Sequence, residues 1–135
     1  LTFGGQNAEA YWSKDGKRIV YQAMLPGYPD EQIFTMRADG SRKELVSTGK
    51  GRCTCSFFPP DGKSLVLSST HERNEGPQAP LDMSKSYVWM INPDYQIYRT
   101  PTDVKPGEKR TWTRLTDLPG KYAAETTISP DGKYM

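Results

Sequence analysis

Residues 71–94 hold the densest group of side chains that could bind a ligand. The polar candidates, one imidazole and three carboxylates, are His71, Glu72, Glu75 and Asp82. The segment also carries two aromatic candidates, Tyr87 and Trp89. Tyr and Trp combine rigid apolar area with a polar tip, so this composition favours a protein-recognition loop. The alternative is that the aromatic residues pack back on the edge of the neighbouring strands.

A metal site is the second chemistry that these residues allow. A simple two-residue hairpin register would place His71 opposite Arg52, within reach of Cys53 or the nearby carboxylates. The chain has a single histidine and lacks the ligand spacing of known zinc motifs. We therefore predict no metal and no cofactor.

The two cysteines stand two residues apart in a segment that reads as extended. Alternation along a strand would place Cys53 and Cys55 on the same face, with Cα atoms about 6.6 Å apart. That separation is near the upper limit for a disulfide, so we predict two free thiols. These thiols do not define the redox compartment.

Glu9, Cys55 and Glu125 share a third kind of candidate position, because each lies at the same distance before an Asp-Gly pair. If they surround a central channel, they could hold a cation or a positively charged peptide segment. The alternative is that each glutamate accepts hydrogen bonds from backbone donors of the incoming link.

The sequence contains no motif that supports catalysis. There is no G-x-S-x-G nucleophile motif and no phosphate-binding loop, and one histidine cannot supply an acid–base set alone. Lys and Arg total 18 against 16 Asp and Glu, without a basic stripe, which disfavours nucleic-acid binding. No apolar run approaches the roughly 18 residues of a membrane span. The sequence starts at Leu1 without a leader, so we expect a processed, cut or omitted N-terminus.

The candidate binding residues must be positioned by β-strand units that repeat along the sequence. Three segments share an Asp-Gly-Lys turn between β-type runs: AYWSKDGKRIV, SFFPPDGKSLV and TTISPDGKYM. The motifs QIF and QIY recur after the first two turns, each followed later by a Leu-Val or Leu-Thr pair. The second copy carries extra residues at only two places, as expected if they fall in loops.

Each copy predicts four short strands, at residues 10–13, 17–22, 32–37 and 42–46 in the first. Gly or Pro interrupts every helical pattern, so we expect almost no helix. A recurring four-stranded antiparallel unit is typical of a propeller blade. The predicted fold is an all-β partial β-propeller within one domain, residues 1–135. It has two four-stranded blades, about 8–46 and 54–116 with an insertion at 71–94, plus the start of a third at 124–135.

One blade cannot bury both of its faces, and propellers usually contain four to eight blades. We therefore expect this chain to be part of a longer propeller, with the remaining blades or another protein as its partner. The Asp-Gly turns should share one face. The insertion and the blade links should lie on the other, where recognition loops are expected.

The repeated sequence segments resemble the TolB-like propeller repeat, also called PD40 or WD40-like. The matching segments are WSKDGKRIVY, FPPDGKSLVLSS, ISPDGKYM and the intervening QIFTMRADGSRKELV. Lys14 replaces the proline of the Ser-Pro-Asp-Gly pattern in the first copy, and Pro59 replaces the serine in the second. The Trp-Asp dipeptide of ordinary WD40 repeats is absent.

The resemblance implies a non-catalytic protein-binding or scaffold propeller, such as an accessory subunit or an envelope protein. It also implies a periplasmic or extracellular location. A second implication is the propeller domain of a prolyl-oligopeptidase-like secreted or periplasmic peptidase, whose hydrolase domain would lie outside these residues. Fold similarity alone does not decide between these functions.

Overall fold

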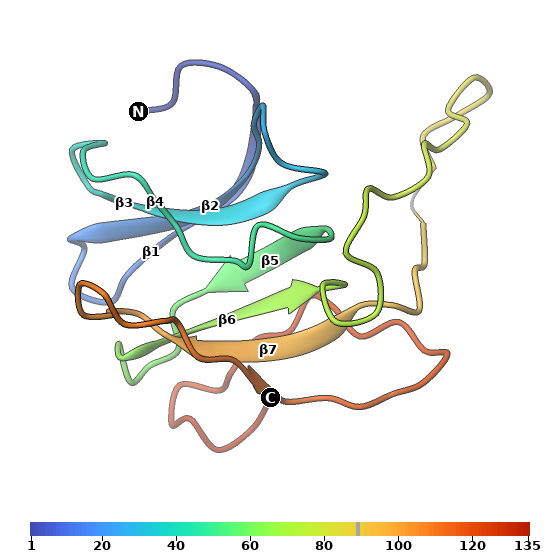
Figure 1. Cartoon of the computed structure of the whole chain (residues 1–135). Coiled ribbons are helices and arrows are strands. Elements are labelled where there is room, and N and C mark those ends of the chain that lie inside the picture. The colour runs from blue at the N-terminus through green and yellow to red at the C-terminus, as the bar shows by residue number, and fades with distance from the viewer. Residues whose placement is uncertain (89) are drawn as a thin grey trace.

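The computed structural model describes residues 1–88 and 90–135, which form two antiparallel sheets of four strands each (Figure 1). The first sheet contains β1 (Gln6–Trp12), β2 (Arg18–Met24), β3 (Gln32–Arg37) and β4 (Glu44–Leu45). The second contains β5 (Cys53–Phe57), β6 (Ser64–Ser69), β7 (Gln96–Pro101) and β8 (Thr113–Arg114). In both sheets the strands follow chain order. The described residues contain no helix, and so none that could span a membrane. The prediction of an all-β partial propeller is confirmed.

The first and third Asp-Gly turns share one hydrogen-bond pattern, whereas in the second copy, where Pro59 replaces the serine, Asp61 accepts from Lys63 and Ser64. In the first copy the Ser13 hydroxyl donates to Asp15 at 2.7 Å, and the Lys17 N–H donates to the same oxygen at 3.1 Å. Ser129 and Lys133 make the same two bonds to Asp131, at 2.7 and 3.1 Å. The third copy thus forms its turn, although no described residue after Arg114 is in a strand.

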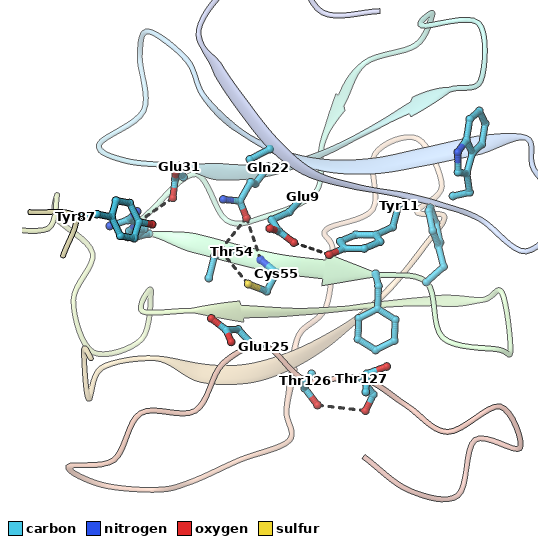
Figure 2. Close-up of a pocket in the computed structure, with 15 residues that line it drawn as sticks. Glu9, Tyr11, Gln22, Glu31, Thr54, Cys55, Tyr87, Glu125, Thr126 and Thr127 are labelled. Carbon is cyan, nitrogen blue, oxygen red and sulfur yellow. Dashed lines mark hydrogen bonds and ion pairs between the residues drawn. The ribbon is translucent and has the colours of Figure 1, made fainter. Parts of the chain in front are cut away.

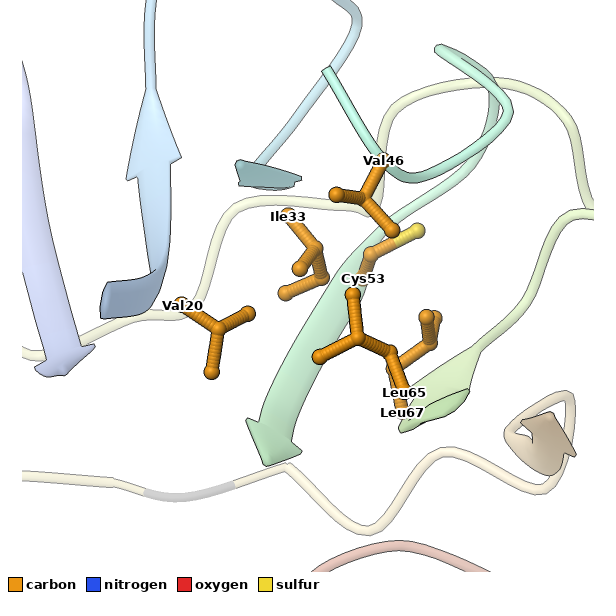
Figure 3. Packing of buried hydrophobic residues seen from close by; sticks show 6 residues of the cluster. All are labelled: Val20, Ile33, Val46, Cys53, Leu65 and Leu67. Atoms are coloured by element: carbon orange, nitrogen blue, oxygen red, sulfur yellow. The ribbon is translucent and has the colours of Figure 1, made fainter. Parts of the chain in front are cut away.

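The core lies between the two sheets. Six buried side chains point toward one another there (Figure 3): Val20, Ile33, Val46, Cys53, Leu65 and Leu67. Burying an aliphatic side chain of this size stabilises the fold by roughly 1.5–3 kcal/mol relative to leaving it in water. The apolar residues of β2, β3 and β6 therefore hold the two sheets face to face.

The outer face of the second sheet is also covered. Val66 and Ile97 are buried there together with Ala123, and Ile128 packs against them. The covering residues come from the C-terminal segment, which passes beside β7 (Figure 1). This segment therefore shields the apolar side chains of that face from water.

The repeated Gln-Ile motif ties each blade to the link that follows it. Gln32 is fully buried, donates to the Gly51 carbonyl at 2.8 Å and accepts from the Ser47 hydroxyl at 2.7 Å. Gln96 is also fully buried and accepts from the Thr116 hydroxyl at 2.9 Å. In both sheets, the buried glutamine side chain thus forms hydrogen bonds with the link that leaves the sheet, which explains why the motif recurs.

Gly51 and Gly62 offer a matched test of this junction. Both have a left-handed backbone, with φ of 60° and 64°. A Cβ at Gly62 would meet nothing within 4 Å, whereas one at Gly51 would lie 2.5 Å from the Thr70 hydroxyl. We expect Gly62→Ala to lower the unfolding free energy by about 1 kcal/mol, and Gly51→Ala by about 2 kcal/mol more. Denaturant titration measures both, and equal losses would contradict the close packing at this link.

Candidate functional site

The innermost strands β1 and β5 each contain a bulge at the same repeat position. The pairing shifts between Ala8 and Tyr11 in β1, and between Thr54 and Phe57 in β5. Glu9 and Cys55 have φ of 49° and 50° within these bulges. The left-handed region costs a non-glycine residue roughly 1–2 kcal/mol, and bulges of this kind usually place glycine there.

Glu125 repeats the same backbone conformation in the C-terminal segment, with φ of 59°. It therefore matches Glu9 and Cys55 in conformation as well as in sequence register. The one other described non-glycine residue with positive φ is Arg42, which precedes β4.

These three residues line a single cavity of about 900 Å³ (Figure 2). Its carboxylates are Glu9, Glu31 and Glu125, and its aromatic residues are Tyr11, Trp12, Phe57, Phe58 and Tyr87. The walls come from β1, β5 and residues 125–127, which are the innermost segments of successive repeats. The cavity is thus bounded by the first strand of each sheet and by the start of the third repeat.

Two of the three carboxylates lack a cationic partner among the residues described. Glu31 is paired with Arg52 at 2.9 Å. Glu9 accepts a hydrogen bond from the Tyr11 hydroxyl at 2.5 Å, and this bond raises the pKa of Tyr11 to about 12. Among the residues described, Glu125 accepts a long hydrogen bond from the Tyr122 hydroxyl, at 3.5 Å. No described backbone N–H donates to the Glu9 or Glu125 carboxylate. Because the lining residues described include three carboxylates and one guanidinium, that of Arg52, the cavity carries excess negative charge.

Gln22 fixes the second bulge from the neighbouring sheet. Its side-chain carbonyl accepts from the Thr54 hydroxyl at 2.8 Å and from the Cys55 N–H at 3.1 Å. The bond to Cys55 satisfies a backbone donor that the bulge removes from the strand ladder. Burial raises the pKa of the Cys55 thiol, and Glu125 and Glu9 raise it further.

The bulge overturns the expected placement of His71. Because β5 gains a residue at Cys55, Arg52 pairs with Thr70, whose N–H donates to the Arg52 carbonyl at 3.1 Å. The His71 ring instead packs on Tyr98, with centroids 4.5 Å apart, and its Nδ1 lies 2.8 Å from the Ser69 hydroxyl. Burial lowers the pKa of His71, so a neutral ring packs at the base of the insertion.

The prediction that Cys53 and Cys55 share a face is wrong for the same reason. Cys53 is fully buried in the core between the sheets, whereas Cys55 lines the cavity. Both thiols are free. Burial raises the pKa of Cys53 to about 11, so it remains a thiol at neutral pH. The described residues form no group of three or more His, Cys, Asp or Glu that could hold a metal ion.

The other candidates of the insertion do not converge on one site. Glu72 pairs with Arg114 at 3.2 Å, and Glu75 pairs with Lys50 at 2.8 Å. Asp82 accepts from the Ser84 N–H at 2.9 Å in a local turn. Tyr87 is 77% exposed and reaches the cavity wall. Trp89 lies outside the described residues.

Sequence reasoning missed several residues of the cavity wall. Tyr11 and Phe57 stand at one repeat position, and Trp12 and Phe58 at the next. Extending the repeat register from Glu9 and Cys55 toward the Asp-Gly turn would have found all four. Gln22 carries no such signal, because the equivalent position in the second repeat is Ser68.

Comparison with known proteins supports the fold. No family model matches the chain, and no curated protein sequence matches it. Among solved structures, TolB from Acinetobacter baumannii aligns over 98% of this chain with 24% identity and a TM-score of 0.65. A putative TolB from Agrobacterium tumefaciens aligns over 98% with 24% identity and a TM-score of 0.67.

The chain spans only part of each of these structures, 26% of the first and 42% of the second. The two sheets, their strand order and the alignment over nearly the whole chain agree with one another. The chain therefore has a TolB-like β-propeller fold.

Proposed function

We propose that this chain is a non-catalytic, protein-binding part of a β-propeller, and that it holds a cationic segment of its partner in the cavity between β1 and β5. The observation that carries the proposal is the strained backbone at Glu9, Cys55 and Glu125, which line one cavity from successive repeats. Backbone strain of this kind concentrates at functional sites, because the surrounding structure must maintain it against a free-energy cost.

The chemistry of the cavity favours an organic cation. Glu9 and Glu125 offer carboxylates that no described cation neutralises, which suits charge-assisted hydrogen bonds from Lys or Arg. Aromatic residues such as Tyr11, Trp12 and Phe57 in the same wall favour a guanidinium or ammonium group through cation–π attraction. A Ca²⁺ ion prefers six to eight oxygen ligands, more than these separated carboxylates supply.

The cellular role that fits this binding mode is that of an accessory or envelope protein. The TolB-like fold supports a scaffold in the periplasm or outside the cell, where the cavity and the insertion would face a protein partner. The remaining blades of a ring would enclose the other side of the cavity.

Thiol labelling of Cys55 tests the charge of the cavity. We expect a cationic methanethiosulfonate reagent to modify Cys55 about threefold or more faster than an anionic one of similar size, because local negative potential concentrates cations. The raised pKa of Cys55 makes both rates increase with pH, since the thiolate reacts, but this effect cancels in their ratio.

The double variant Glu9→Gln with Glu125→Gln should remove the preference for the cationic reagent. Glu108→Gln is the matched control, because this exposed carboxylate lies outside the cavity. Mass mapping assigns each modification to Cys55. Equal rates for the two reagents with the wild-type protein would contradict the proposed charge, as would a preference that survives the double substitution.

A peptide array tests the ligand class. The wild-type protein should bind peptides containing Lys or Arg and lose affinity when citrulline or norleucine replaces that residue. The double variant should bind the same basic peptides about tenfold or more weakly, because it loses the opposing charges. An array whose binding peptides are not enriched in basic residues would argue against a cationic ligand.

A further inference from the structure

Gln22 uses only half of its side-chain amide to hold the second bulge. The side chain lies in the cavity wall and is only 6% exposed. Its carbonyl oxygen accepts from the Thr54 hydroxyl and from the Cys55 N–H. Because a backbone N–H can only donate, the oxygen must face Cys55, and this fixes the direction of the amide nitrogen. In Figure 2 that nitrogen is turned away from Thr54 and Cys55, on the side where Glu31 lies.

The amide nitrogen of Gln22 carries two N–H donors that the fold does not use. Among the residues described, neither of them donates a hydrogen bond. The two other buried glutamines of the sheets both donate to backbone carbonyls, Gln32 to Gly51 at 2.8 Å and Gln96 to Leu118 at 3.3 Å. A largely buried donor without an acceptor has a free-energy cost, which an acceptor supplied by a ligand would relieve.

The strands beside Gln22 favour a peptide backbone as the source of that acceptor. β1 and β5 are the first strands of their sheets, so each pairs with one neighbour only. Both line the cavity, and all seven residues of β1 are exposed. The free edge of a strand presents backbone groups that suit pairing with another extended chain. The carboxylates of Glu9 and Glu125 in the same wall require that this chain carry a cation.

We infer that Gln22 donates a hydrogen bond to a main-chain carbonyl of an extended peptide, whose basic side chain lies between Glu9 and Glu125. This inference rests on the proposed function, because it adds a main-chain contact to the cationic site. Gln22 then has two roles, since its oxygen maintains the bulge and its nitrogen reads the ligand. The contact distinguishes a basic peptide from a simple organic cation such as a polyamine, which offers no carbonyl group.

A peptide with single backbone replacements tests this contact. The probe is the pentapeptide Ala-Ala-Lys-Ala-Ala, blocked at both ends. In two analogues an (E)-alkene replaces the amide bond before or after the lysine, which removes one carbonyl and one N–H but keeps the shape of the chain. Isothermal titration calorimetry measures each affinity. For the wild-type protein, we expect one of the analogues to bind about fivefold or more weakly than the parent peptide, because it leaves the Gln22 donor without its acceptor.

Two substitutions of Gln22 assign the lost carbonyl to this residue. Gln22→Glu keeps an oxygen for Thr54 and Cys55 but has no N–H donor at pH 8, where the introduced carboxyl group is charged. Gln22→Ser copies Ser68, the residue at this position of the second repeat, and serves if the first variant does not fold. In either variant the parent peptide and the analogue should bind within about twofold of each other. The added charge of Gln22→Glu affects both peptides and cancels in this ratio.

Gln6→Glu is the matched control, because Gln6 is exposed at the start of β1 and lies outside the cavity wall. It adds the same charge and should retain the fivefold difference between the peptides. Equal binding of all three peptides to the wild-type protein would mean that water satisfies the Gln22 donor, which would overturn the inference while leaving the cationic site intact. A difference that persists in both Gln22 variants would overturn it too. If norleucine in place of lysine leaves the affinity of the parent peptide unchanged, the proposed cationic site fails, and this contact fails with it.

Discussion

A left-handed turn of the backbone at one point of each innermost strand determines how this chain is arranged. At Glu9 and Cys55 the bulge adds one residue to the strand, which changes the register on one side of it. That shift sends Cys53 into the core and Cys55 into the cavity, and it moves His71 away from Arg52. The cavity and the packing between the sheets are therefore consequences of the same backbone constraint.

Buried amides make this strained backbone compatible with a stable fold. Gln22 crosses from the first sheet to bond the Cys55 N–H, and Gln32 bonds the Gly51 carbonyl where the chain enters the second sheet. Each satisfies a polar backbone group that the strand ladder leaves unpaired, and an unpaired group of this kind costs about 1–3 kcal/mol when buried. The polar contacts at the junction thus stabilise the backbone conformation that forms the cavity wall.

The sequence predicts the repeated features of this fold well, because each is a local pattern. The Asp-Gly turns, the four strands per sheet and the equivalence of Glu9, Cys55 and Glu125 all follow from spacing. The bulge could not be predicted from spacing, because glycine, its usual sequence signal, is absent from all three positions. A regular hairpin register then misplaces His71. The approach of Tyr87 to the cavity depends on a long connection, whose path no periodicity defines.

The most direct test of the account is the unfolding free energy of glycine substitutions at the bulge. Glycine adopts the left-handed region without steric cost, so Glu9→Gly, Cys55→Gly and Glu125→Gly should preserve stability or raise it by up to about 1 kcal/mol. Ala10→Gly, at the other residue of the β1 bulge, which has no positive φ, should lower it by roughly 0.5–1 kcal/mol. If all four substitutions destabilise the protein equally, the backbone at Glu9, Cys55 and Glu125 is not strained, and the account is wrong.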